Sequence, residues 1–247
     1  MPVSKAALLI SALVPVSSAW EHVEAVSETM STSVSDNYTT YRLYVELSDS
    51  SASAYALFGS KSGHLWIPPA YQDKTFGQNM GGVDPNVIKV SAAKNAQWDS
   101  WLTVGIVDGD AAGLLGAVGL GSAFKAWSET QGIDSTDGSV FWMNPTKSTA
   151  TKKNGKVCVA QLTFAKTYKG CAAKMGVTGK DTSGNIWRDD GVQWVINGGS
   201  KCPEWAGPPP PTPHPNPTTP PVGSAASSVL LSPLALLGTI LLASSIF

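Results

Sequence analysis

Residues 41–47 read YRLYVEL, an alternation of apolar and polar side chains that is typical of a β-strand with one buried face. The turn-forming residues 48–51, SDSS, follow directly, and residues 54–58, AYALF, make a second short run of strand-forming side chains. The two runs and the turn between them predict a β-hairpin over residues 41–58.

Further short runs of β-branched, aromatic and other apolar residues follow, with Gly, Pro, Asp or Asn between most of them. They predict strands at residues 65–67, 87–90, 101–107, 139–143, 157–164, 172–177 and 192–196. Residues 114–120 and 123–127 favour one short helical turn each, within a loop that crosses between sheets, because their glycines oppose a long helix. Eight or nine short strands indicate an all-β fold, an antiparallel β-sandwich-like single domain.

Other segments flank the predicted domain of residues 37–202. Residues 1–19 have the pattern of a signal peptide, with Lys5, an apolar run and small residues before Trp20. Residues 20–36 are polar and lack a sustained period, so we expect a loosely held lead-in. Residues 203–222 are rich in proline, which predicts an extended, semi-rigid stalk.

Residues 223–247 have two interpretations. The small residues from Gly223 and Ser224 onward, followed by an apolar tail, fit a signal for attachment of a glycosylphosphatidylinositol (GPI) anchor. The apolar tail is also long enough for a membrane-spanning helix, although no Lys or Arg lies after Lys201. Either interpretation predicts a membrane-anchored protein that reaches the cell surface by the secretory pathway, and GPI attachment is the favoured one.

Charged residues are sparse and nearly balanced. The chain has 17 Lys and Arg against 18 Asp and Glu, a formal net charge of −1, and loss of Lys5 with a signal peptide leaves −2. Nucleic-acid binding requires a basic surface, so this composition gives no support for it.

Three cysteines, Cys158, Cys171 and Cys202, predict one disulfide and one free thiol in an oxidising compartment. Cys158 alternates in phase with the apolar residues of the strand predicted at 157–164, which favours a buried thiol. We therefore expect Cys171 to pair with Cys202, while the other two pairings remain open.

Motifs for nucleophilic catalysis are sparse. Only His64 lies within the predicted domain, so a Ser-His-Asp triad would have to use it. The nearby run GSKSG at residues 59–63 has lysine where a nucleophile elbow has serine, and a hairpin loop is the simpler interpretation.

Carboxylates near strand ends allow two kinds of chemistry. Asp99, Asp108 and Asp110 are candidate calcium ligands, although their spacing does not match an EF-hand and Asp-Gly is an ordinary turn signature. Together with Glu129 and Asp134, they are also candidates for the paired carboxylates of a polysaccharide hydrolase. Turn chemistry is the plainer interpretation, so we expect no cofactor, and calcium is the less favoured alternative.

Two tryptophans lie in polar surroundings. Trp98 and Trp187 are candidate binding residues, because an exposed indole can stack on a sugar ring or contact a protein partner, whereas core packing is the alternative. Asn37 begins the one usable acceptor motif for N-glycosylation, Asn37-Tyr38-Thr39.

Several runs resemble a β-rich extracellular module that recurs in secreted and surface proteins of algae and other protists. They are WDSWLTVG at 98–105, DGD at 108–110, VFWMNP at 140–145, VAQLT at 159–163, the strand at 41–47 and the turn PPAY at 68–71. The resemblance covers roughly residues 38–197. It implies an extracellular module of multidomain surface proteins that often stands beside adhesive or matrix domains.

These features together predict a cell-surface binding or adhesion protein, or a protein of the extracellular matrix or wall. Its expected partner is an extracellular glycan or a matrix or surface protein, and glycan binding is one form of the function. The alternative is a surface-tethered polysaccharide hydrolase.

Overall fold

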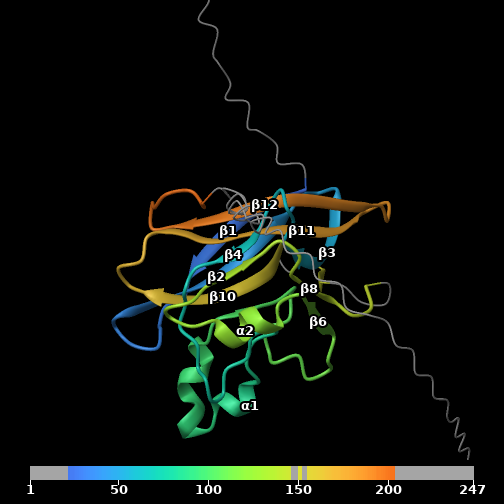
Figure 1. Cartoon of the computed structure of the whole chain (residues 1–247). Helices are drawn as coiled ribbons and strands as arrows, with labels where there is room; N and C mark the ends of the chain where they lie inside the picture. Colours follow the sequence, from blue (N-terminus) through green and yellow to red (C-terminus); the bar gives the residue numbers. More distant parts are fainter. Residues whose placement is uncertain (1–21, 146–149, 152–154, 204–247) are drawn as a thin grey trace, which may run out of the picture. The chain divides into compact units, whose positions relative to one another are not determined.

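The computed structural model describes residues 22–145, 150–151 and 155–203, which form two antiparallel β-sheets (Figure 1). The predicted all-β, sandwich-like class is therefore confirmed. The predicted signal peptide, the stalk beyond residue 203 and the C-terminal anchor with Gly223 and Ser224 lie outside the described residues. Within the described part of the chain, no helix is long and apolar enough to span a membrane.

The first sheet has the strand order β1-β2-β10-β5. The bounds of these strands are Val23–Thr29 for β1, Tyr38–Leu47 for β2, Lys156–Ala165 for β10 and Trp101–Leu102 for β5.

The second sheet has the order β6-β8-β3-β11-β4-β7, with β12 paired to β11 and β9 paired to β3. Its strands are β3 (Ser51–Phe58), β4 (Leu65–Ile67), β6 (Leu115–Val118), β7 (Ile133–Ser135), β8 (Ser139–Trp142), β9 (Ala150–Thr151), β11 (Gly170–Asp181) and β12 (Ile186–Ile196).

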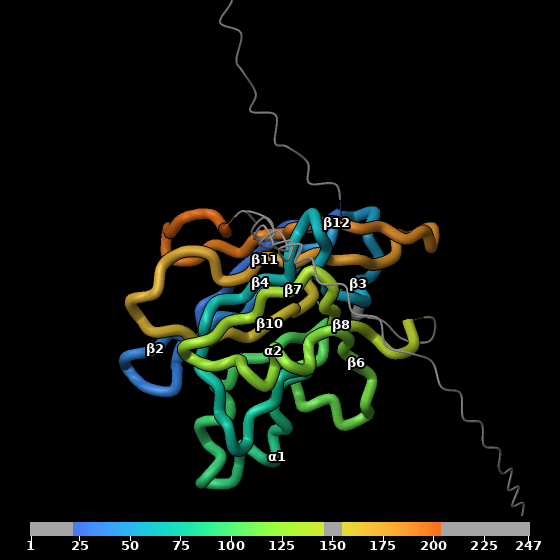
Figure 2. The backbone as a smooth tube through the Cα atoms, in the orientation of Figure 1, coloured from blue at the N-terminus to red at the C-terminus, as the bar shows by residue number. Residues whose placement is uncertain are grey.

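Among the described residues, three short helices lie outside the sheets: α1 (Pro85–Ile88), the 3₁₀ helix η1 (Ser91–Trp98) and α2 (Gly121–Ala126). Helix η1 contacts β10 of the first sheet, α1 contacts η1, and α2 contacts β7 of the second sheet. Figure 2 shows the segment with α1 and α2 on the side away from β11 and β12. Gln161 of β10 donates two hydrogen bonds at the end of η1, to the backbone oxygens of Gln97 and Asp99, both at 2.9 Å. Strand β10 is consequently buried on both faces.

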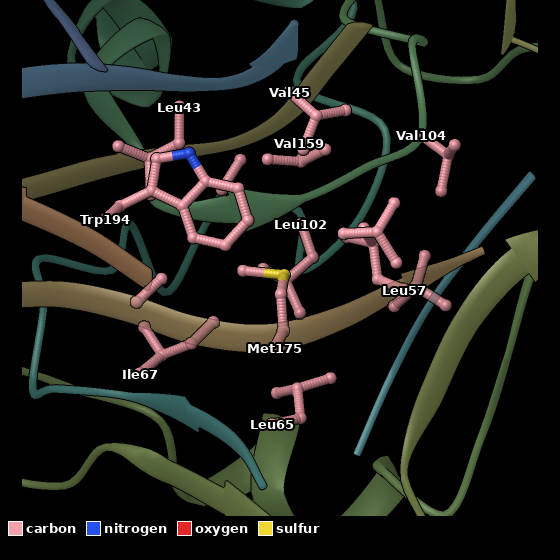
Figure 3. Packing of buried hydrophobic residues seen from close by; sticks show 14 of the residues in the cluster. Leu43, Val45, Leu57, Leu65, Ile67, Leu102, Val104, Val159, Met175 and Trp194 are labelled. Atoms are coloured by element: carbon pink, nitrogen blue, oxygen red, sulfur yellow. The ribbon is translucent and has the colours of Figure 1, made fainter. Parts of the chain in front are cut away.

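The core lies between the two sheets. The predicted alternation of β2 is confirmed, because its odd-numbered residues from Tyr41 to Leu47 are buried and the even-numbered ones are half-buried. Figure 3 shows Leu43 of the first sheet near Trp194, with Met175 of the second sheet between Leu102 and Leu65. The Trp194 indole also donates a hydrogen bond across the core to the backbone oxygen of Tyr44 at 2.8 Å.

The predicted hairpin over residues 41–58 is wrong. Strand β2 pairs with β1 and β10, whereas β3 pairs with β11, β8 and β9 in the other sheet. The serine-rich turn therefore carries the chain from one sheet to the other. The alternation identifies the buried face of each strand but not the neighbour with which it pairs.

The predicted loose lead-in at residues 20–36 is also wrong for its central part. Strand β1 pairs with β2 over seven residues, from Val23 opposite Leu47 to Thr29 opposite Tyr41. His22 precedes it, and its ring stacks on Trp187 with 5.5 Å between ring centroids. The domain therefore begins near residue 22 rather than at residue 37.

No strand forms at 87–90, because this range begins inside helix α1, which ends at Ile88. Asp84 caps α1 by accepting a hydrogen bond from the backbone N–H of Asn86 at 2.7 Å, and Pro85 occupies the first helical position. Both residues are start signals of a helix, and here they outweigh the β-propensity of Val87 and Ile88.

Two glycine-containing segments also differ from prediction. The strand predicted at 101–107 ends after Leu102, and Gly105 beyond it has a φ of +83°. The loop predicted at 114–120 contains strand β6, which pairs with β8. Gly116 fits there because a Cβ atom at this position would lie 2.7 Å from the Met143 sulfur.

The predicted disulfide between Cys171 and Cys202 is confirmed, and Cys158 is free and buried. A β-bulge lies between Cys158 and Ala160, so Cys158 stands opposite Tyr44 on the outer face rather than in phase with Ala160 as predicted. Burial raises the pKa of the Cys158 thiol to about 12.

Reduction of the disulfide should lower the stability of the domain by about 2–4 kcal/mol, because the bridge spans 31 residues and limits the freedom of the unfolded chain. Thermal unfolding with and without reductant measures the loss. Cys158 should react with an alkylating reagent only after unfolding, since its thiol is buried and protonated. Rapid alkylation of Cys158 in the folded protein would contradict this assignment.

Candidate ligand-binding pocket

A pocket of about 220 Å³ opens where the first residue of β2 and the last residue of β10 lie side by side. Tyr38 and Ala165 are register partners at this end of the sheet. Three further segments complete the pocket: the loop after β4, the loop after α2 and the turn between β10 and β11. The lining residues are Tyr38, Pro69, Ala70, Tyr71, Glu129, Thr163, Phe164, Ala165 and Tyr168.

The loop after β4 is held against the sheet by backbone hydrogen bonds. The N–H of Tyr71 donates to the oxygen of Thr163 in β10 at 2.9 Å, and the N–H of Ala70 donates to the oxygen of Ser128 at 3.0 Å. Pro68 and Pro69 restrict the backbone just before these contacts. The Tyr71 ring is therefore presented to the pocket by a fixed loop.

Aromatic rings make up two walls of the pocket. The rings of Tyr38 and Tyr71 meet edge to face with 5.9 Å between centroids, and those of Phe164 and Tyr168 stack with 4.8 Å between centroids. The Tyr168 hydroxyl donates to the backbone oxygen of Cys171 at 2.5 Å. The second wall is thus attached to one residue of the disulfide.

Glu129 contributes a carboxylate at the edge of the pocket. It is exposed, and it accepts a hydrogen bond from the Tyr38 hydroxyl. The pKa of Tyr38 is raised, first by this hydrogen bond and then by burial and the negative charge of Glu129. The pKa of Tyr71 is raised by burial and by the charges of Asp73, Asp99 and Glu129. The phenols therefore stay protonated and can act as hydrogen-bond donors.

A second, polar pocket of about 370 Å³ shares Tyr38 with the first. It is lined by Thr29, Met30, Ser31, Thr32, Ser33, Ser35, Asp36, Tyr38, Thr39 and Lys166. The first pocket and this one therefore adjoin at Tyr38, one largely aromatic and the other rich in hydroxyl groups.

Neither predicted tryptophan lines these two pockets. Trp187 is 4% exposed and stacks on His22, so its predicted role as an exposed binding residue is wrong. Trp98 is half-buried at the end of η1, and its backbone oxygen accepts a hydrogen bond from Thr163 at 2.6 Å.

The three candidate calcium ligands do not form a metal site. Among the described residues, no group of three or more His, Cys, Asp or Glu side chains is placed to hold a metal ion. Asp110 accepts hydrogen bonds from the backbone N–H groups of Leu114 and Leu115 at 2.8 and 2.9 Å, and Asp108 is exposed. Asp110 therefore shapes the turn before β6, which is the alternative to calcium binding given above.

Asp99 has a structural role of its own. It is fully buried, and its two carboxylate oxygens accept hydrogen bonds from the backbone N–H groups of Asp73 and Gln78, each at 2.7 Å. Burial raises the pKa of Asp99 to about 7 and outweighs these hydrogen bonds, which lower it. The side chain fixes the loop that follows Tyr71.

The carboxylates proposed for a hydrolase have separate partners. Glu129 binds Tyr38, whereas Asp134 lies 2.6 Å from the His64 Nδ1 atom, in a different pocket. His64 is 7% exposed and its Nε2 atom is buried. The geometry therefore gives the hydrolase interpretation no support.

Asn37, the predicted glycosylation site, is exposed in the turn before β2. This position is open to modification, and glycosylation itself stays a prediction.

The tyrosine residues of the pocket were not among the residues predicted from sequence. Tyr38, Tyr71 and Tyr168 lie far apart in the chain, so no single local motif contains all three. One signal does exist, because the turn PPAY at 68–71 is both rigid and aromatic.

Comparison of this chain with protein families, with curated proteins and with solved structures finds no match.

Proposed function

We propose that this protein is an extracellular binding protein that recognises glycans through the pocket of Tyr38, Tyr71, Tyr168 and Glu129. The observation that carries the proposal is the pairing of aromatic walls with a carboxylate at one accessible site. Sugar rings have an apolar face that packs on an aromatic ring and hydroxyl groups that need hydrogen-bond partners. The rings and polar groups of this pocket offer both.

A rigid setting also supports binding. Backbone hydrogen bonds hold the loop of Tyr71, and the Tyr168 hydroxyl donates a hydrogen bond to the backbone oxygen of Cys171. Tyr38 lies at the end of a paired strand. A ligand that enters such a site loses less free energy to ordering of the protein.

The setting of this function rests on sequence. The signal-peptide pattern, the proline-rich segment, the terminal apolar run and the resemblance to extracellular modules support display at the cell surface. We include GPI attachment near Gly223 or Ser224 in the proposal. Release of the native protein from cells by a phosphatidylinositol-specific phospholipase tests this part, and retention in the membrane would count against it.

A glycan array probed with the purified full-length protein, followed by calorimetry on the best ligand, tests the proposed function. Tyr71→Ala should weaken binding at least about tenfold, because it removes one aromatic wall. Tyr71→Phe should keep most of the affinity, since the ring remains.

Trp98→Ala serves as the control outside the pocket and should bind like the wild type. A loss of binding in Trp98→Ala but not in Tyr71→Ala would move the site to the tryptophan and away from the pocket.

A further inference from the structure

The charge on the lining of the tyrosine pocket is of one sign. Glu129 is the one charged side chain among its described lining residues. Asp73 acts on Tyr71 with the same sign as Glu129 and raises the pKa of its phenol. The pocket therefore attracts a positive charge more than a neutral group, and it repels an anion.

No lysine is among the described residues that line the tyrosine pocket. Lys74, which donates from its Nζ atom to the backbone oxygen of Trp127 at 2.8 Å, lines a different pocket. Lys166 lines the adjoining polar pocket instead. An acidic sugar would therefore meet a carboxylate and no facing base in the tyrosine pocket.

Aromatic rings favour a cation as well. The faces of tyrosine rings carry negative potential and attract an ammonium group that lies over them. A sugar that carries a free amine presents an apolar ring face to the tyrosines and an ammonium group to Glu129. Acetylation of that amine removes the charge and keeps the ring.

From this geometry we propose that the ligand of the tyrosine pocket is an amino sugar with a free, protonated amine, as in a deacetylated hexosamine polymer. This inference rests on the function proposed above and specifies its ligand class. Glu129 is the residue that selects the amine, while the tyrosines bind the ring.

The test compares two oligosaccharides of equal length and linkage, one of glucosamine and one of N-acetylglucosamine, by calorimetry on the purified full-length protein. The glucosamine oligomer should bind about tenfold more tightly, because only it pairs a charge with Glu129. The preference should shrink as salt is added, since the carboxylate is exposed and the interaction is screened.

Glu129→Gln is the decisive variant. Glutamine keeps an oxygen that can accept the Tyr38 hydrogen bond but carries no charge, so both oligomers should bind with similar affinity. Lys166→Gln changes a charge in the adjoining pocket and should preserve the preference for the free amine.

Equal affinity of the wild type for the two oligomers, or a preference that persists in Glu129→Gln, would overturn the inference. If a neutral glycan binds at Tyr71 and neither of these oligomers does, the amine assignment is wrong and the proposed function stands. If no glycan binds at all, the proposed function fails with it.

Discussion

A protein that starts at Asn37, the domain boundary expected from sequence, should be markedly less stable than one that starts at Trp20. The difference is β1, which pairs with β2 over seven residues and brings the buried Val23 into the core. The start of β1 is held by hydrogen bonds to the Asp189 carboxylate. The Nδ1 atom of His22 lies 2.8 Å from one carboxylate oxygen, and the backbone N–H of Val23 donates to the other at 3.2 Å. Removal of the strand exposes a strand edge that favours aggregation.

We expect the loss to reach about 3 kcal/mol or more, which corresponds to a fall of roughly 10 °C in the melting temperature. Circular dichroism during heating measures it on both proteins. If the shorter protein melts within a few degrees of the longer one, β1 is not part of the folding unit.

Asp99→Ala should destabilise the domain by about 2–4 kcal/mol at pH 5. The substitution leaves the backbone N–H groups of Asp73 and Gln78 without their acceptor, and each such loss costs about 1–3 kcal/mol. Urea unfolding measures the change. Asp181→Ala is the matched control, because Asp181 also accepts two backbone hydrogen bonds, from Ser183 and Asn185, but in an exposed turn. Asp181→Ala should shift the urea midpoint of unfolding much less than Asp99→Ala does.

The effect of Asp99 should also depend on pH. Its pKa is about 7 in the folded protein and about 3.9 in an unfolded chain, so folding favours the protonated form. Its contribution to stability is therefore full below about pH 4 and is lost as pH rises toward 7. The wild type should lose about 2 kcal/mol between pH 5 and pH 8 that Asp99→Ala does not lose. If the free energy of unfolding changes with pH in the same way in the wild type and in Asp99→Ala, the pH dependence does not come from Asp99.

Sequence patterns predicted strands that alternate between two faces or that carry an uninterrupted apolar run. Strand β2 alternates between buried and half-buried positions, and the runs at 65–67, 139–143 and 157–164 lie in strands β4, β8 and β10. Strand β1 was missed because it pairs with only one strand of its sheet and, apart from Val23, keeps no residue fully buried, so it lacks a clear period. The pairing of β2 with β10 joins residues more than 100 positions apart, which no local pattern encodes.

The candidate site was harder to predict for the same reason. Glu129 was predicted as a candidate because it is a carboxylate, but its place in the pocket depends on its contact with Tyr38, which lies 91 residues away in the chain. The two tryptophans were predicted as candidates because they are large and lie in polar segments. Trp187 is nevertheless buried, and the ring of His22, which precedes the unpredicted strand β1, stacks on it. Residue type indicates which side chains can bind a ligand, and the fold decides which of them meet.

A crystal structure of the protein with the best ligand from the glycan array tests the central claim most directly. We predict a sugar ring packed against Tyr38, Tyr71 or Tyr168, with a polar group of the sugar bound to Glu129. A glycan bound elsewhere on the domain, with the tyrosine pocket left open, would contradict the account.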